Sequence, residues 1–187
     1  MITYNTTTQL PYEPHKLCAL VSNVDDYHLF LPWCASSRVL TSCTPPHDCF
    51  SSKRHDDYTC VNSFQGELRI EYGLLRQTFL SDVTEYQSSD GNHYQINAFS
   101  DQPPFKLLNN VWTFQSVPNL QENTKTLSQG DPKILEKNSH CLVTFSITLA
   151  LKNILLHALV DRNITRITQK IMKAFEEHAK TLYGQSR

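Results

Sequence analysis

The 187-residue chain has little glycine, almost no net charge and no long apolar run. Its five glycines form no glycine-rich phosphate loop, and neither the GxSxG of serine hydrolases nor the HExxH of zinc proteases occurs. A formal net charge of −1 excludes a basic field over the whole protein for nucleic acid. The apolar stretch Ile154–Val160 is far shorter than the roughly 20 residues of a membrane span. No secretory signal is apparent at the start, so we expect one globular domain over residues 1–187.

The six cysteines include no CxxC pair. Cys18 and Cys141 adjoin apolar residues and are expected to be small buried side chains. A chain of this size forms its own core, so we expect no disulfide framework and a reducing compartment. One polar stretch gathers possible zinc ligands at gaps that match no usual zinc knuckle. These ligands are Cys43, His47, Cys49, His55 and Cys60. We interpret them as incidental residues of a surface loop and expect no metal.

Alternation of apolar and polar side chains predicts a run of strands. The expected strands cover residues 2–9, 35–44, 58–70, 72–86, 94–99, 111–117 and 140–151, with a hairpin turn at 88–92. Two short helices are expected after the first strand, one from Glu13 and one over Asp25–Phe30, which Pro32 ends. Two polar segments without periodicity, residues 44–57 and 118–139, are expected to be inserted surface loops.

The C-terminal segment predicts an amphipathic helix of about 30 residues and about 45 Å. Asn153 suits the N-cap, and Gly184 suits the position after the last turn. An apolar stripe recurs at steps of three and four residues. It comprises Leu156, Val160, Ile164, Ile167, Ile171, Phe175 and Leu182. The expected fold class is therefore α+β: a curved antiparallel sheet with the long helix across its concave face and a cavity between them.

Three segments resemble the helix-grip (START-like, polyketide cyclase/dehydrase) superfamily. They are Phe30-Leu31-Pro32-Trp33-Cys34, Pro104–Leu108 followed by Trp112 and Phe114, and Ala174–Gly184. Together they are similar to the coenzyme Q-binding START-domain family and its bacterial relatives of the RatA type. The resemblance extends from Tyr4 to Gly184, and the two polar loops depart from it.

The resemblance implies that the protein binds ubiquinone or a similar polyprenyl lipid. It implies a lipid chaperone or carrier for the respiratory chain rather than an enzyme, with no cofactor beyond the bound lipid. It also implies a peripheral place on the matrix side of the mitochondrial inner membrane, with respiratory complexes as partners. For a bacterial source, the expected location is the cytoplasm.

The alternative implied by the bacterial relatives is binding to the large ribosomal subunit. RNA affinity rests mostly on phosphate neutralisation, so this function requires a basic face. The outer face of the predicted helix offers Lys152, Arg162, Arg166, Lys170, Lys173 and Lys180. Glu176 and Glu177 weaken that face, and nucleic acid is not the leading expectation.

An isoprenoid tail needs only an apolar wall, which is worth about 25 cal/mol per Å² buried. The candidate ligand-binding residues are Trp33, Phe64, Phe79, Phe105, Leu108, Trp112, Phe114, Phe145, Ile164, Ile171 and Phe175. Aromatic side chains are more often plain core, but Trp33, Phe105 and Trp112 are expected beside prolines at the cavity mouth. Arg38 and Lys106 are candidate donors to a quinone head.

Two further features have surface interpretations. His157 and Asp161 stand four residues apart and are expected to pair on the helix; without a nucleophile they form no catalytic triad. The apolar turn Phe30–Trp33 is either a membrane anchor or a lid folded inward, and the residues leave both open.

Overall fold

The computed structural model describes residues 1–43, 57–72, 75–118 and 140–184. Its elements are β1 (Ile2–Leu10), α1 (Pro14–Ser22), a 3-10 turn (Val24–Asp26), α2 (Tyr27–Phe30), β2 (Cys34–Cys43), β3 (Tyr58–Tyr72), β4 (Leu75–Ser88), β5 (His93–Ser100), β6 (Phe105–Val117), β7 (His140–Leu151) and α3 (Ile154–Tyr183). The predicted inserted loops fall almost entirely on residues 44–56 and 119–139, outside the described residues, as do His47, Cys49 and His55.

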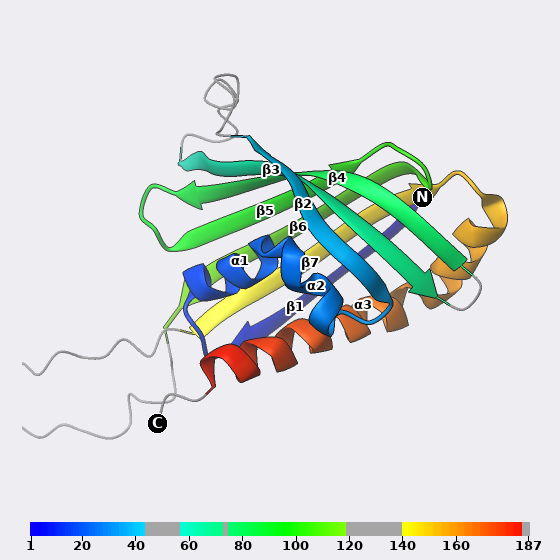
Figure 1. Cartoon of the computed structure of the whole chain (residues 1–187). Helices are drawn as coiled ribbons and strands as arrows, with labels where there is room; N and C mark the ends of the chain where they lie inside the picture. The colour runs from blue at the N-terminus through cyan, green and yellow to red at the C-terminus, as the bar shows by residue number, and fades with distance from the viewer. Residues whose placement is uncertain (44–56, 73–74, 119–139, 185–187) are drawn as a thin grey trace, which may run out of the picture.

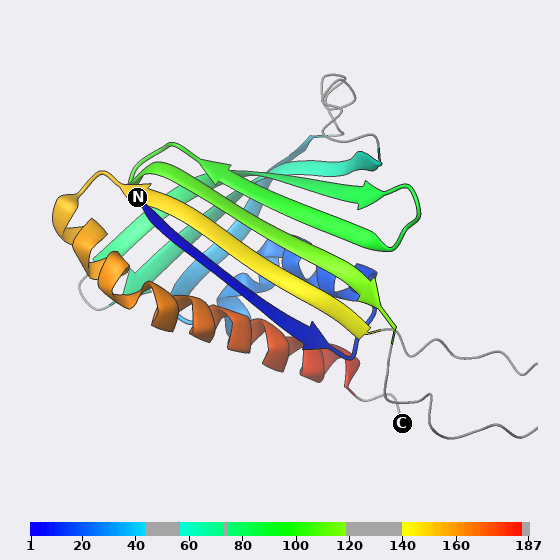
Figure 2. The ribbon, with the colours of Figure 1, turned by 180° about the vertical axis from the view of Figure 1, so that it is seen from behind.

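A seven-stranded sheet in the order β1-β7-β6-β5-β4-β3-β2 forms the body of the protein. Every neighbouring pair is antiparallel. The sheet curves, and α3 lies along the side of its concave face, while α1 and α2 cover the other end of that face (Figure 1). Seen from behind, no helix formed by the described residues covers the convex face of the sheet (Figure 2). The predicted α+β helix-grip fold is confirmed.

Alternation along the strands determines which side chains reach the core. In β7, Cys141, Val143 and Phe145 are buried, while the residues between them are half-buried. The predicted hairpin between β4 and β5 also forms, and Gly91 there has φ +69°, a left-handed conformation that glycine adopts without steric cost. Side chains of one parity therefore face α3 across most of the sheet.

The long helix α3 begins as its sequence predicts. The side chain of Asn153 accepts hydrogen bonds from the backbone N–H groups of Leu155 and Leu156, at 2.9 and 3.0 Å. At the other end Gly184 has φ −78°, not the left-handed value expected of a capping glycine. Its N–H still donates to the Lys180 carbonyl at 2.9 Å, so the helical geometry simply continues to this residue.

Two clusters of buried side chains hold α3 against the sheet. The larger one joins α1, the middle strands and the second half of α3 through Phe114, Phe145, Met172, Phe175 and Ala179, among others. The smaller one lies at the opposite end and comprises Ile2, Phe105, Leu108, Leu149 and Leu151, with Phe79, Ile147, Leu156, Val160 and Ile164 packed against it. The space between the clusters is not filled by side chains.

Three expectations for the fold were wrong. β6 begins at Phe105 rather than at Val111, because the run Leu107-Leu108-Asn109-Asn110 does not alternate in the sequence, although it pairs with β7 in continuous register. Leu182 is 53% exposed, because Ala179 and Tyr183 occupy the packed face of the last turns. His157 does not pair with Asp161; its Nδ1 accepts a hydrogen bond from the Leu151 N–H at 3.3 Å, which ties the start of α3 to β7.

Candidate functional site

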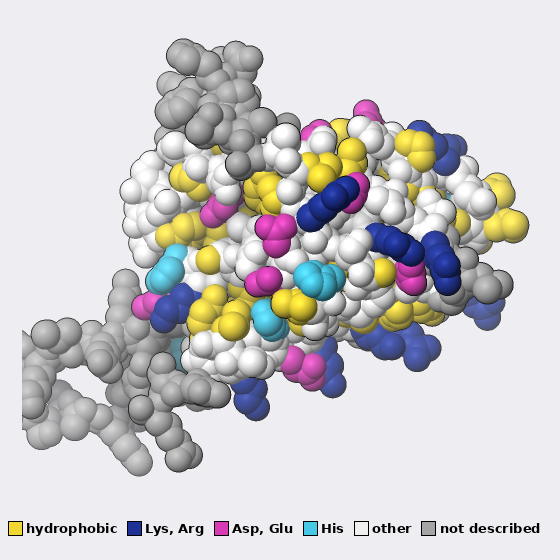
Figure 3. Space-filling view, in the orientation of Figure 1, with side chains coloured by type: hydrophobic (Ala, Val, Ile, Leu, Met, Phe, Trp, Pro, Cys, Tyr) yellow, Lys and Arg dark blue, Asp and Glu magenta, His cyan; other side chains and the backbone are white. Residues whose placement is uncertain are grey.

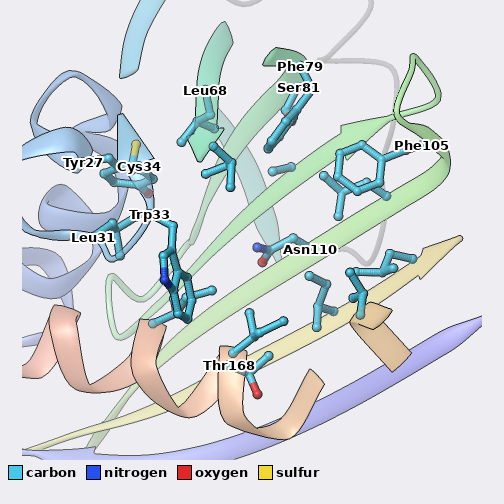
Figure 4. Close-up of a pocket in the computed structure, with 18 of the residues that line it drawn as sticks. Tyr27, Leu31, Trp33, Cys34, Leu68, Phe79, Ser81, Phe105, Asn110 and Thr168 are labelled. Carbon is cyan, nitrogen blue, oxygen red and sulfur yellow. The ribbon is translucent and has the colours of Figure 1, made fainter. Parts of the chain in front are cut away.

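A cavity of about 300 Å³ lies between the concave face of the sheet and α3. Its walls come from β2 to β7, from the turn between α2 and β2, and from one face of α3 between Leu156 and Phe175 (Figure 4). The volume stands at the lower end of the range of small-molecule sites in proteins. Leu159 and Tyr72 line the cavity and are 44% and 37% exposed, so the cavity reaches the surface beside them.

Nine of the eleven candidate ligand-binding residues line this cavity. They are Trp33, Phe79, Phe105, Leu108, Trp112, Phe145, Ile164, Ile171 and Phe175. Phe64 and Phe114 are absent from its lining. Both are buried in the larger core cluster, where they pack against other side chains. Their expected place on the cavity wall was therefore wrong, because they lie in the packed core beside the cavity.

The expected positions at the mouth also need correction. Trp112 lies in the middle of β6 and is 5% exposed, with its ring centroid 4.6 Å from that of Phe145 and 4.9 Å from that of Phe175. Phe105 is buried as the first residue of the same strand and meets Phe79 edge to face at 5.0 Å. Both are deep wall residues. Only Trp33 of the three stands where the mouth opens.

Neither cation proposed for a polar head group reaches the cavity. Arg38 is exposed and its Nε lies 2.7 Å from the Glu67 carboxylate, an ion pair on the outer surface of the sheet edge. Lys106 is exposed on β6 and is absent from the lining. These expectations failed because both side chains project from the face of their strand that points away from α3.

The most informative polar group in the cavity is the amide of Asn110. This residue lies on β6 opposite Ala98 of β5 and Ile147 of β7, both of which line the same cavity. Its Oδ1 is buried and has no hydrogen-bond partner. Figure 4 shows the amide projecting into the space between the strands and α3. A buried unpaired amide oxygen costs about 1–3 kcal/mol, so the site carries a polar group that packing alone does not explain.

Asn110 was not among the candidate residues, because the strand was predicted to start one residue after it. Once β6 includes this residue, the parity of the strand gives a usable signal. Leu108, Asn110, Trp112 and Phe114 share one face, and Asn110 is the single polar member of an otherwise apolar series. A polar residue at an inward position of a strand is a marker for a site.

The described cavity lining contains no Asp, Glu, His, Lys or Arg. Two weak acids of the lining, Cys34 and Tyr27, are held neutral by burial. Burial raises the pKa of the Cys34 thiol, and burial raises the pKa of the Tyr27 phenol, whose hydroxyl donates to the Val21 carbonyl. Among the residues that the structure describes, no three His, Cys, Asp or Glu side chains gather as a metal site. The wall is mostly apolar, and its uncharged polar side chains include Asn110, Gln77, Asn163, Ser81 and Thr168.

Trp33 occupies the turn between α2 and β2 in an uncommon conformation, with φ +65°. Its ring meets Tyr72 of β3 edge to face at 5.0 Å, and Lys170 of α3 lies 5.1 Å from its centroid. The preceding Phe30 stacks on His178 at 4.1 Å and meets Phe175 edge to face at 5.1 Å. The turn is thus folded inward over the cavity, as the lid interpretation predicted.

Most of the chain matches a known protein family. The family described as polyketide cyclase / dehydrase and lipid transport matches residues 10–176. The chain belongs to this family. Its members include cyclases, and the solved structures of similar fold include an aromatase/cyclase. Membership therefore agrees with the observed fold, but it does not identify the ligand of the cavity.

Two kinds of curated relatives are similar to the chain. The ribosome association toxin RatA of Rickettsia prowazekii is 27% identical over 180 residues, which cover 96% of this chain and 97% of that protein. The mitochondrial coenzyme Q-binding protein COQ10 of Dictyostelium discoideum is 27% identical over 115 residues, which cover 62% of this chain and 47% of that protein. Both names describe binding or association rather than catalysis.

Among solved structures, the 18 kDa protein CC1736 of Caulobacter crescentus is 26% identical and has a TM-score of 0.61, with 98% of this chain and 99% of that chain covered. A START superfamily protein of Mycobacterium smegmatis has a TM-score of 0.63 at 15% identity, with 96% and 98% covered. The second likeness supports the fold alone. None of the helices in the described part of the chain is long and apolar enough to span a bilayer.

Proposed function

We propose that the protein binds a polyprenyl quinone of the ubiquinone type and acts as its carrier or chaperone, without catalysing a reaction on it. The observation that supports this most directly is the cavity wall, which is mostly apolar and carries one buried amide oxygen without a hydrogen-bond partner, that of Asn110. A polyprenyl quinone has the matching chemistry, because its tail is apolar, its ring oxygens accept from an amide N–H, and the hydroxyls of its quinol form can donate to an amide oxygen. The similarity to a coenzyme Q-binding protein agrees with this ligand.

The position of Asn110 suggests an orientation for the ligand. The polar ring would lie deep against β6, where an amide N–H can donate to a quinone oxygen and the amide oxygen can accept from a quinol hydroxyl. The first isoprene units would lie along Ile164 and Ile171 of α3. Because the cavity is small, the rest of a long tail would leave between Trp33 and Leu159, where the cavity reaches the surface.

Two side chains allow a sharp test. Among the described residues, Asn110 carries the only buried side-chain amide oxygen without a partner, and Asn110→Leu removes it. Asn109→Leu is the matched control, because Asn109 is exposed on the opposite face of β6. Ala98→Phe fills the space directly across from Asn110. Trp112→Ala is unsuitable, because it would empty a packed core position at a cost of about 3–5 kcal/mol.

The measurement is mass spectrometry of lipid extracts from the purified full chain. Wild type and Asn109→Leu are expected to contain quinone well above an unrelated control protein. Asn110→Leu is expected to lose about tenfold in affinity, the value of one buried hydrogen bond of about 1.4 kcal/mol, and Ala98→Phe to lose the ligand entirely. Wild-type extracts without quinone would refute the proposal.

A second candidate function is association with the large ribosomal subunit. It is favoured by the RatA relatives, which match nearly the full chain, and by the exposed cations Arg162, Arg166 and Lys170 along α3. Binding of this kind would fall steeply with salt. Salt-sensitive co-sedimentation with large subunits would support it, and pelleting no greater than that of a neutral control protein would exclude it.

The expected location in the cell depends on which of the two proposed functions is correct. The quinone carrier would lie peripherally on the matrix side of the mitochondrial inner membrane, close to respiratory complexes, or on the cytoplasmic face in a bacterium. The mitochondrial name of the Dictyostelium relative supports the first place, and the bacterial RatA relatives support the second.

A further inference from the structure

The first turns of α3 expose large apolar side chains to solvent. Ile154 is 80% exposed, Leu155 is 79% exposed and Leu159 is 44% exposed. Single exposed leucines are ordinary, but three large apolar side chains within six residues form a patch. Figure 3 shows hydrophobic side chains at the end of the molecule where α3 begins, with Lys and Arg side chains along the adjoining lower edge.

A basic stripe continues directly from this patch. Leu155, Leu159, Arg162, Arg166 and Lys170 follow one another at steps of four, three, four and four residues, so they lie in one line along α3. All five side chains are exposed. The line is apolar in the first turns of α3, at Leu155 and Leu159, and basic from Arg162 to Lys170.

The charge along α3 is distributed unevenly. Residues 152–170 carry four Lys or Arg side chains and one Asp, a net charge of +3, whereas residues 171–184 carry two Lys and two Glu, a net charge of zero. In the described residues, neither Arg162 nor Arg166 forms an ion pair. The cations are therefore concentrated, unneutralised, beside the exposed apolar side chains.

We propose that this stripe, Ile154 to Lys170, is a docking surface for an anionic lipid bilayer. Ile154, Leu155 and Leu159 would insert at the level of the acyl chains, and Arg162, Arg166 and Lys170 would meet the lipid phosphates. A nucleic acid would use the cations alone and would gain nothing from the exposed apolar side chains. The combination of both features in one line is what selects a bilayer.

The place of the stripe links it to the cavity. Leu159 belongs to both, and Lys170 lies over Trp33 at the turn that covers the mouth. Docking would therefore turn the mouth toward the lipid, a consequence that rests on the proposed function. The turn Phe30–Trp33, the membrane anchor considered from the sequence, is engaged by Phe175, His178 and Tyr72 instead.

The test is flotation of the full chain with vesicles that contain no quinone. One set is phosphatidylcholine alone, and the other is phosphatidylcholine mixed with phosphatidylglycerol. Wild type is expected to float with the anionic set and to be released by salt. Ile154→Ser with Leu155→Ser removes two side chains that do not line the cavity. The expected loss is at least about tenfold in the partition coefficient for each side chain.

Matched controls separate this surface from general effects. Leu29→Ser with Leu182→Ser changes two leucines that are 67% and 53% exposed elsewhere, and is expected to float like wild type. Arg162→Glu with Arg166→Glu is expected to weaken binding to anionic vesicles by more than about twentyfold, at about 1 kcal/mol for each cation. Lys173→Glu with Lys180→Glu, in the neutral half of α3, is the charge control.

Three results would overturn the proposal. The first is wild type that does not float with anionic vesicles, and the second is equal loss in the stripe variants and their controls. The third is wild type that binds large ribosomal subunits instead, losing them with the arginine variant but not with the serine variant. Quinone is measured separately in Ile154→Ser with Leu155→Ser, where it should remain bound, so failure of docking is distinguishable from failure of ligand binding.

Discussion

Cys18 and Cys141 are almost completely buried thiols in the larger core cluster. Burial raises the pKa of the Cys141 thiol to about 12, and burial together with the neighbouring Glu85 carboxylate raises that of Cys18 well above its usual range. Cys18 donates from its Sγ to Glu85 at 3.2 Å, and Ser22 donates to the same carboxylate at 2.9 Å. Both cysteines act as small core side chains, as their apolar neighbours in the sequence indicated.

These shifts predict a loss of stability in mild alkali. An unfolded thiol loses its proton from about pH 9, whereas the folded thiols keep theirs, so the folded state binds more protons and the free energy of unfolding falls as pH rises. The stability is fully present below pH 9 and declines from there toward the folded pKa values. Between pH 9 and 10 the expected slope is up to about 1.4 kcal/mol per pH unit for each thiol.

Urea unfolding followed across pH 7–10 measures this slope. Cys141→Ala should be less stable at pH 7, because it leaves a small void, and should show a shallower decline above pH 9. Thr7→Ala is a control, because Thr7 is exposed and its hydroxyl contacts Thr144 rather than either thiol. A decline above pH 9 that is identical in wild type and Cys141→Ala would contradict the assignment.

In the turn between α2 and β2, Trp33 combines a left-handed backbone conformation with a ring that lies over the cavity mouth. A tryptophan at φ +65° costs about 1–2 kcal/mol relative to glycine, and here the ring is held by Tyr72 and Lys170 over the cavity mouth. The conformation directs the side chain from the sheet edge toward α3. The cost in backbone energy is offset by contacts that cover the opening.

Comparison of Trp33→Gly with Trp33→Ala separates these two contributions. Both variants lose the ring, so both should release bound quinone to acceptor vesicles several times faster than wild type. Trp33→Gly should be more stable than Trp33→Ala by about 1 kcal/mol in chemical denaturation, because only glycine adopts the left-handed conformation freely. Equal stability of the two variants would contradict a cost of the left-handed conformation at residue 33. An unchanged release rate would show that the Trp33 ring does not retain the ligand.

The pairing of β6 with β7 indicates whether the whole molecule needs the segment that connects them. Val117 pairs directly with His140 in the antiparallel register, so the two strand ends lie within reach of a short hairpin loop. We therefore expect that residues 119–139 can be replaced by a four-residue Gly/Asn turn without loss of the fold. A shorter closed loop should stabilise the protein by about 1 kcal/mol.

Circular dichroism, a single cooperative unfolding transition and the quinone content of the purified variant test this expectation. A variant that folds but loses quinone would show that the segment takes part in binding. A variant that does not fold would show that the segment contributes to the core. Either result would contradict its interpretation as an insertion.

Much of the fold was predictable from local patterns, for identifiable reasons. β7 was predicted to the residue, because alternation along His140–Leu151 is unbroken. The start of α3 was predicted, because Asn153 has a local capping role. The alternation signal failed before Val111, because Leu107-Leu108-Asn109-Asn110 does not alternate in the sequence. The late predicted start of the strand hid Asn110 and misplaced Phe105 and Trp112 at the mouth.

The sequence alone was sufficient for the antiparallel order of elements, the apolar stripe of α3 and most of the aromatic wall, because these depend on periodicity and on the hydrophobic effect. Tertiary structure decided which buried side chains face empty space and which pack: Phe64 and Phe114 face the core, whereas Asn110 faces the cavity. It also decided that Ile154 and Leu155 remain exposed. These outcomes depend on where α3 lies across the sheet, a distance between elements that no local pattern encodes.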